Sequence, residues 1–216
     1  MQHSPSPEER TEEIRLRYIS LLTPLFFPDD PAGHDIVPYF ASLLRIVGME
    51  DKGWDPYVES RAVLEDLNAL MQLDLPEDKF QDKERTVWRL GLIFYTHIVE
   101  MDAPYEVLTN LLRFRLGKGY SPNPFFDFLT KQQKKRFKSA GLFPKQKIDI
   151  IKQLSTEARL GIGEIFDDFF RIDLRNAISH SDFIVTEEHF RSRSENWTRP
   201  FTIRLEELDE LGCGLN

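Results

Sequence analysis

Arg175, Asn176 and His180 are the residues of this 216-residue chain whose types and spacing best suit a chemical reaction. Histidine exchanges protons near neutral pH, because an unperturbed imidazole titrates near ~6.5. Arginine stays charged and grips phosphate oxygens through a planar fork of N–H groups. The Asn176 amide orients either partner without adding charge. Together these groups predict RNA cleavage by attack of the ribose 2′-OH on the adjacent phosphorus, without a metal ion.

The spacing of these residues is informative because asparagine directly follows the arginine. On an ideal helix Asn176 and His180 lie about 40° apart around the axis, whereas Arg175 and His180 lie about 140° apart. The long arginine side chain still reaches the same cleft if the helix loosens at His180. Arginine and histidine at this spacing are common by chance, but the version with asparagine is expected only about 0.01 times in a chain of this composition.

The motif resembles the hallmark of the HEPN superfamily (higher eukaryotes and prokaryotes nucleotide-binding domains). That hallmark is Arg, a polar residue, three further residues and His at the end of a long helix, which corresponds to Arg175, Asn176 and His180. Residues 94–105 are similar, more loosely, to the first helical hairpin of bacterial members, and the whole resemblance covers 81–210. It implies an all-α bundle, usually a homodimer, that acts as a metal-independent endoribonuclease.

The same resemblance implies a biological setting and an alternative. Such proteins commonly serve as toxins or in antiviral defence against phage, so a regulatory partner or an antitoxin is expected beside the RNA substrate. Other members of the superfamily are inactive binding modules. The alternative function is therefore a non-catalytic nucleotide- or RNA-binding module, or a helical interaction protein.

A homodimer is also a chemical expectation. The reaction needs a base for the 2′ proton and an acid for the 5′ leaving oxygen, yet each motif supplies one histidine. Two copies that meet across a two-fold axis would supply two, and such dimers are the commonest oligomers. A water molecule or His97 could substitute.

Each of these residues also has a structural interpretation. A histidine at a helix C-terminus is favoured by the helix dipole without any catalysis. An arginine on the motif helix could pair with an acid on the same helix, namely Asp167, Asp168 or Asp173. His97 is interpreted as a core histidine with its hydrogen bonds satisfied, and Glu100 and Asp102 as solvated.

The net charge of −8 conceals a basic block at residues 113–152, which holds 11 Lys and Arg against 2 Asp and Glu. A cationic segment in an acidic chain is a candidate phosphate-facing surface. The alternative is an ordinary lysine-rich solvated helix. The densest part of the block predicts RNA-binding residues at Lys131, Lys134, Lys135, Arg136 and Lys138.

Composition excludes several other classes of protein. One cysteine, Cys213, excludes an internal disulfide framework and suits a reducing compartment. The first residues lack the basic and apolar regions of a signal peptide, and no apolar run would span a bilayer. We therefore expect a cytoplasmic protein with no membrane contact. No His-Glu-x-x-His or paired-cysteine pattern occurs, so no metal and no cofactor are expected.

Hydrophobic periodicity predicts an all-α helical bundle with a small C-terminal β-hairpin. Residues 1–80 are expected to form a helical extension that either stands apart or merges with the bundle, and 81–216 the HEPN-like domain. The hairpin would pair strands at 183–186 and 201–204. A loop at 117–128, rich in aromatic residues, would be a lid, a dimer contact or a plug on the core. Helices are expected at about 7–22, 35–47, 56–75, 79–101, 104–117, 129–139, 144–158, 163–180 and 205–211.

Overall fold

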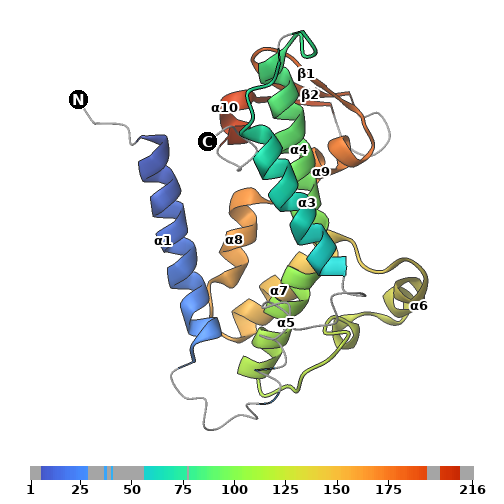
Figure 1. The fold of residues 1–216 in the computed structure, drawn as a ribbon. Helices are drawn as coiled ribbons and strands as arrows, with labels where there is room; N and C mark the ends of the chain where they lie inside the picture. The colour runs from blue at the N-terminus through green and yellow to red at the C-terminus, as the bar shows by residue number, and fades with distance from the viewer. Residues whose placement is uncertain are drawn as a thin grey trace. The chain divides into compact units, whose positions relative to one another are not determined.

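The computed structural model describes residues 6–28, 37, 40, 56–76, 78–193 and 200–209. Within these residues the chain is mostly α-helical, with a small three-stranded antiparallel sheet (Figure 1). This confirms the predicted class. None of the described helices is both long enough and apolar enough to cross a bilayer. The helix expected at 35–47 lies almost entirely outside the described residues, as does Cys213.

The chain divides into two compact units, each formed from two separate stretches of sequence. The first unit comprises Met1–Gly53 and Asp102–Asp167, and the second comprises Trp54–Met101 and Asp168–Asn216. The segment 1–80 contributes to both, because α1 (Pro7–Phe26) falls in the first unit and α3 (Pro56–Met71) in the second. The expected domain boundary near residue 80 remains a prediction.

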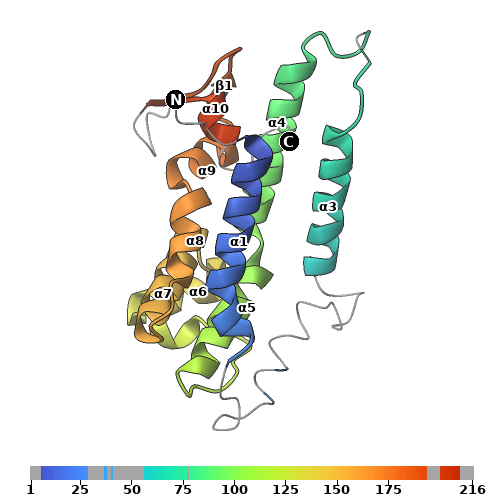
Figure 2. The ribbon, with the colours of Figure 1, turned by 90° about the vertical axis from the view of Figure 1, so that its left-hand side faces the viewer.

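The first unit is built around two packed helices, α5 (Asp102–Arg115) and α7 (Pro144–Glu157), and α1 also packs on α5 (Figure 2). A short 3-10 helix, η1 (Phe126–Phe128), and the basic helix α6 (Lys131–Ala140) lie between α5 and α7 in the sequence. The ends of α5, α6 and α7 match the expected ones within a few residues, whereas η1 lies in the expected loop 117–128. Side chains with almost no exposed surface form the core of the unit: Leu25, Leu111, Leu112, Ile148, Ile151, Leu154 and Ile162.

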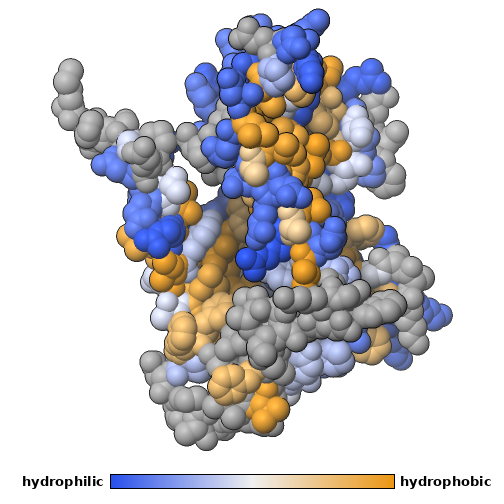
Figure 3. Space-filling model, in the orientation of Figure 1, coloured by the Kyte–Doolittle hydropathy of each residue, from blue (hydrophilic) through white to orange (hydrophobic). Residues whose placement is uncertain are grey.

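α1 begins at the expected residue but continues beyond its expected end near residue 22. Ser6 Oγ accepts a hydrogen bond from Glu9 N–H at 3.2 Å, and the Glu9 carboxylate accepts one from Ser6 N–H at 2.7 Å, which forms a capping box. The helix continues past Pro24 instead of stopping near Leu22. Proline removes one backbone bond, and Leu25, which is fully buried, anchors this last turn. Figure 3 shows apolar side chains on the surface of α1 among charged ones. The exposed large apolar residues of this helix are Ile14, Leu16 and Ile19.

In the second unit α4 (Lys83–Glu100) packs against α3, against α9 (Ile172–Ser179) and against β1 (Phe183–Val185). One face of α4 enters the core, as the helical spacing of its buried residues requires. The core cluster comprises Trp88, Leu92, Tyr95, Val99, Leu174, Ala177, Val185, Phe190, Ile203, Leu205 and Leu208. The last two residues belong to the short helix α10 (Leu205–Leu208).

The two expected strands are present, but they do not pair with each other. A third strand, β2 (His189–Ser192), lies between β1 and β3 (Phe201–Arg204) and pairs antiparallel with both. Phe190 stands opposite Val185 on one side and Ile203 on the other, and all three are buried. Phe190 is the one apolar residue of β2, so the strand lacked the alternating pattern that identified its neighbours.

The single helix expected at 163–180 is two helices, α8 (Ile162–Phe169) and α9, separated at Phe170 and Arg171. The Arg171 backbone is extended, with φ −115° and ψ 106°. The hydroxyl of Tyr95, from α4, lies at this break. It accepts a hydrogen bond from Arg171 N–H at 2.9 Å and donates one to the Phe169 carbonyl at 3.1 Å. The phenol thus satisfies two backbone groups that a continuous helix would have paired internally.

Tyr95→Phe is expected to lower the free energy of unfolding by about 1–3 kcal/mol, because it leaves the Arg171 N–H and the Phe169 carbonyl without their partner. Urea denaturation followed by circular dichroism measures this loss. Tyr120→Phe is the matched control, since Tyr120 is 41% exposed, and it should change stability by less than about 0.5 kcal/mol. Equal effects of the two substitutions would contradict a bridging role for Tyr95.

Candidate functional site

The motif residues lie on α9 and at its end. Arg175 and Asn176 occupy the middle of the helix, and His180 is its C-cap, with φ −96° and ψ 4°. The helix therefore ends before His180, which is the loosening that the sequence led us to expect at this residue. His180 is exposed to solvent, whereas Arg175 and Asn176 are half-buried. The His180 N–H donates to the Asn176 carbonyl at 3.0 Å, so the two residues are also joined through the backbone.

The backbone after His180 turns sharply and is held by two hydrogen bonds. Ser181 N–H donates to the Ile178 carbonyl at 2.9 Å, and Asp182 N–H donates to the Ala177 carbonyl at 2.9 Å. This pair of bonds is a Schellman motif, which requires a left-handed residue at Ser181. Ser181 has φ +54°, a conformation that glycine adopts far more readily. After this turn the chain continues directly into β1, and His180 lies exposed at the C-terminal end of α9.

Two groups hold the Arg175 guanidinium. Its Nε donates to the carboxylate of Glu100, the last residue of α4, and its Nη1 donates to Asn176 Oδ1 at 3.0 Å. The Arg175 side chain is 17% exposed and that of Glu100 is 39% exposed. No partner for Nη2 of Arg175 lies among the described residues. The arginine is thus fixed from two sides, with its Nη2 N–H groups left for a ligand.

Glu100 is the residue of this site that the sequence interpretation missed. It was interpreted as solvated, as was Asp102; both carboxylates are exposed, but Glu100 also binds Arg175 and Asp102 also binds Lys147. One feature of the sequence indicated that Glu100 has a cationic partner. An acid in the last turn of a helix is disfavoured by the helix dipole, so Glu100 implied a nearby cation. One of the three acids suggested for the motif arginine, Asp173, pairs with Arg171 instead, at 2.8 Å.

The interaction of His97 fits the structural interpretation. Its Nε2 lies 3.1 Å from the Ser60 carbonyl in α3, and because a carbonyl only accepts, Nε2 is the donor. The ring is half-buried. This bond ties α3 to α4, the two helices that pack together in the second unit. His97 therefore has a structural partner, and the proton-transfer role considered for it has no support in this contact.

The basic block separates into paired and unpaired cations. Carboxylates pair with its members on and beside α5 and α7: Arg113 with Asp127, Lys118 with Glu157, Lys145 with Asp149, Lys147 with Asp102, and Lys152 with Asp167. On α6 the situation differs. In the part of the chain that the structure describes, no carboxylate lies within ion-pair distance of Lys131, Lys134 or Lys135. Arg136 lies 4.8 Å from the centroid of the Phe143 ring. The Lys138 side chain lies outside the described residues.

The motif and α6 belong to different units: the motif residues lie in the second and α6 lies in the first. The structure thus gives two separate candidate surfaces, one with an arginine and a histidine and one with unpaired lysines. Over the described ranges, no three His, Cys, Asp or Glu side chains gather in a way that could hold a metal ion. Asp167, one of the acids suggested as a partner for an arginine on the motif helix, pairs with Lys152 instead.

Comparison with known proteins gives no identification. No protein-family profile, no curated protein and no solved structure matches this chain.

Ser181→Gly is expected to raise the free energy of unfolding by about 0.5–1 kcal/mol, because glycine adopts the left-handed conformation without the steric cost. Ser179→Gly supplies a control of the same chemical type. Ser179 is exposed and lies inside α9, so its replacement should lower stability by about 0.5–1 kcal/mol. Chemical denaturation of both variants measures the two changes in the free energy of unfolding, which should have opposite signs. A loss of stability in Ser181→Gly would contradict the strained turn.

Proposed function

We propose that this protein is a metal-independent endoribonuclease that cleaves RNA by attack of the ribose 2′-OH on the adjacent phosphorus. The observation that carries the proposal is the geometry of Arg175. The guanidinium is held by Glu100 and Asn176 through Nε and Nη1, while Nη2 remains for a phosphate oxygen. An arginine positioned in this way costs little reorganisation when negative charge develops on the phosphorus.

The proposed reaction forms one bond and breaks another. The 2′ oxygen bonds to phosphorus, the bond from phosphorus to the 5′ oxygen breaks, and the products are a 2′,3′-cyclic phosphate and a 5′-hydroxyl. One proton leaves the 2′-OH and one reaches the 5′ oxygen. His180 is exposed at the end of α9 and is assigned one of these transfers. Arg175 stabilises the dianionic phosphorane between the two steps.

A second copy of the chain would supply the second proton-transfer group. Each chain offers one motif histidine, so a homodimer with its two α9 ends facing each other would place one His180 on each side of the scissile phosphate. The exposure of His180 is compatible with that arrangement. Asn176 would hold Arg175 in each copy, as it does in the single chain.

The setting of this activity follows from the resemblance to HEPN proteins. We place the protein in the cytoplasm, as a toxin or a phage-defence effector restrained by a regulatory partner or antitoxin.

A non-catalytic binding module is the second candidate, and one observation favours it. Glu100 already neutralises much of the charge of Arg175, which weakens the attraction of the arginine for phosphate. In that case RNA binding would depend on α6 and would survive the loss of His180.

His180→Ala is expected to reduce cleavage of labelled single-stranded RNA by about 10²–10⁴-fold, since it removes a proton-transfer group. Wild type and variant are compared in EDTA, with end-group analysis for 2′,3′-cyclic phosphate. His189→Ala is the matched control, because His189 lies in the same unit on β2, beside Glu188 at 3.9 Å, and it should cleave as wild type does. RNA that stays intact with wild-type dimer, while still being bound, would favour the binding module.

Arg175→Lys is expected to lower kcat by about 10²–10³-fold with a smaller change in KM, because lysine keeps the charge but loses the fork that contacts Glu100, Asn176 and phosphate together. Arg171→Lys, four residues earlier, is the control. Arg171 pairs with Asp173, and lysine can keep that ion pair, so kcat should change little. Single-turnover cleavage separates the chemical step from binding, and equal rates for the two variants would argue against a transition-state role for Arg175.

A further inference from the structure

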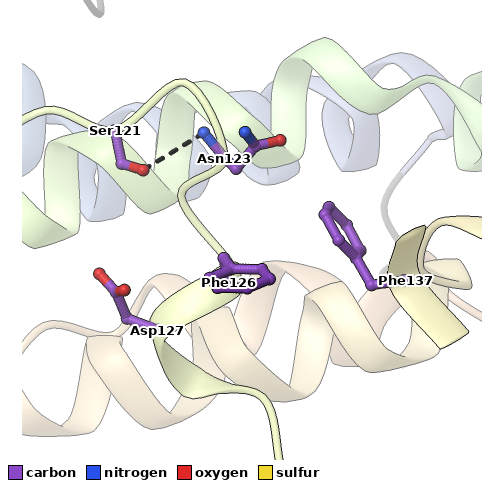
Figure 4. A pocket seen from close by; sticks show the side chains of 5 residues that line it. All are labelled: Ser121, Asn123, Phe126, Asp127 and Phe137. Atoms are coloured by element: carbon purple, nitrogen blue, oxygen red, sulfur yellow. Dashed lines mark hydrogen bonds between the residues drawn. The ribbon is translucent and has the colours of Figure 1, made fainter. Parts of the chain in front are cut away.

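We propose that a pocket in the first unit binds one nucleotide of single-stranded RNA, with its base against the rings of Phe126 and Phe137 and its phosphate on α6. The pocket has a volume of about 510 Å³ and is open to solvent. This volume lies within the ~300–1,000 Å³ of small-molecule sites. Figure 4 shows the Phe126 ring at its centre, Phe137 across from it on α6, and the polar side chains around them; the lining residues are Ser121, Asn123, Phe126, Asp127 and Phe137.

The loop that forms this pocket is held in place by two side chains of α5. The Asn110 side chain exchanges two hydrogen bonds with the Ser121 backbone, each 3.0 Å long. Arg113, which is 7% exposed, donates to the Gly119 carbonyl at 3.2 Å, the Pro124 carbonyl at 3.4 Å and the Asp127 carboxylate at 2.8 Å. A loop fixed by two buried side chains loses little entropy when a ligand binds, so the pocket is preorganised.

The chemistry of the lining fits a nucleobase. Phe126 and Phe137 are half-buried, with ring centroids 6.0 Å apart and planes tilted by 58°. Such tilted rings offer one face for stacking and one edge beside it. Stacking of a base on an aromatic side chain tolerates any sequence, because every base has a π face. Ser121 and Asn123 place hydroxyl and amide groups at the rim, where the polar edge of a base would lie.

The charges around the pocket fit a phosphate. The Lys134 ammonium lies over the ring of Phe126, a lining residue, at 4.7 Å from the ring centroid. Lys131 and Lys135 stand on the same helix, and none of these three lysines has a carboxylate partner among the described residues. The one acid in the lining, Asp127, is balanced by Arg113. An aromatic platform beside unpaired cations is the combination by which proteins bind single-stranded nucleic acid.

The identity of the ligand as RNA rests on the proposed function. The pocket itself is formed by residues of the first unit, whereas the motif residues lie in the second. Loop 117–128 was expected to be a lid, a dimer contact or a plug. Phe125 acts as the plug, with 3% of its surface exposed, while Phe126 is half-buried and lines the pocket.

The test is a fluorescence-anisotropy titration of labelled single-stranded RNA with the full chain carrying His180→Ala, which prevents cleavage. Phe126→Leu and Phe137→Leu should each weaken binding by about 5- to 150-fold, from the usual contribution of a stacked base. Their dependence on salt should stay unchanged, whereas Lys134→Gln should reduce the slope of log K against log salt by ~0.7. Phe137→Tyr keeps the aromatic face and should bind within about twofold of the parent.

Phe143→Leu is the matched control, because Phe143 is 46% exposed and has a cation over its ring but does not line the pocket. It should leave affinity unchanged. In a parallel experiment, RNA that contains 5-iodouridine should form photo-crosslinks to Phe126 or Phe137, a readout that does not depend on the folding of any variant. Equal affinity of all the phenylalanine variants, or crosslinks only outside residues 121–137, would overturn the proposal.

The two proposals fail separately. Wild-type protein that binds RNA through Phe126 and Phe137 but never cleaves it would remove the nuclease and keep the pocket. Cleavage that depends on His180, with binding indifferent to both rings, would remove the pocket and keep the nuclease.

Discussion

The second unit depends on one buried hydroxyl. The Tyr95 oxygen stands between the end of α8 and the start of α9, where it accepts from the Arg171 N–H and donates to the Phe169 carbonyl. Without these bonds the break would leave backbone groups unpaired beside the core, at a cost that would favour a continuous helix. The break resets the rotation of α9 about its axis. Which face of α9 carries Arg175 therefore depends on a residue of α4.

Most helices could be predicted from the sequence, because their signals are local. Ser6 with Glu9 marks the start of α1, and Pro144 marks the start of α7. The break between α8 and α9 could not, since no glycine or proline occurs there and its cause lies on α4. Strand β2 could not be predicted for a related reason. Its pairing depends on two other strands, and Phe190 is its one apolar residue.

The candidate site likewise has a part that could be predicted from the sequence and a part that could not. Residue type and spacing were sufficient to select Arg175, Asn176 and His180, whose chemical roles remain predictions. The Glu100 contact needs the packing of α4 on α9, which periodicity does not give. In the basic block, a cation is available to a ligand only where no carboxylate pairs with it. Five of the block's cations are paired with carboxylates, so the character that composition suggested for the whole segment remains chiefly with Lys131, Lys134 and Lys135 on α6.

In the proposed nuclease, the serine that follows His180 would be a compromise between stability and activity. Where stability alone matters, a left-handed position at the end of a helix favours glycine, which relaxes the backbone in the folded state but also gives it more freedom. A side chain at Ser181 restricts the native ensemble to fewer conformations near the histidine. Strain of this kind is concentrated where geometry matters more than free energy of folding. In the proposed nuclease, this restricted turn after α9 would limit how far the imidazole moves between successive substrates.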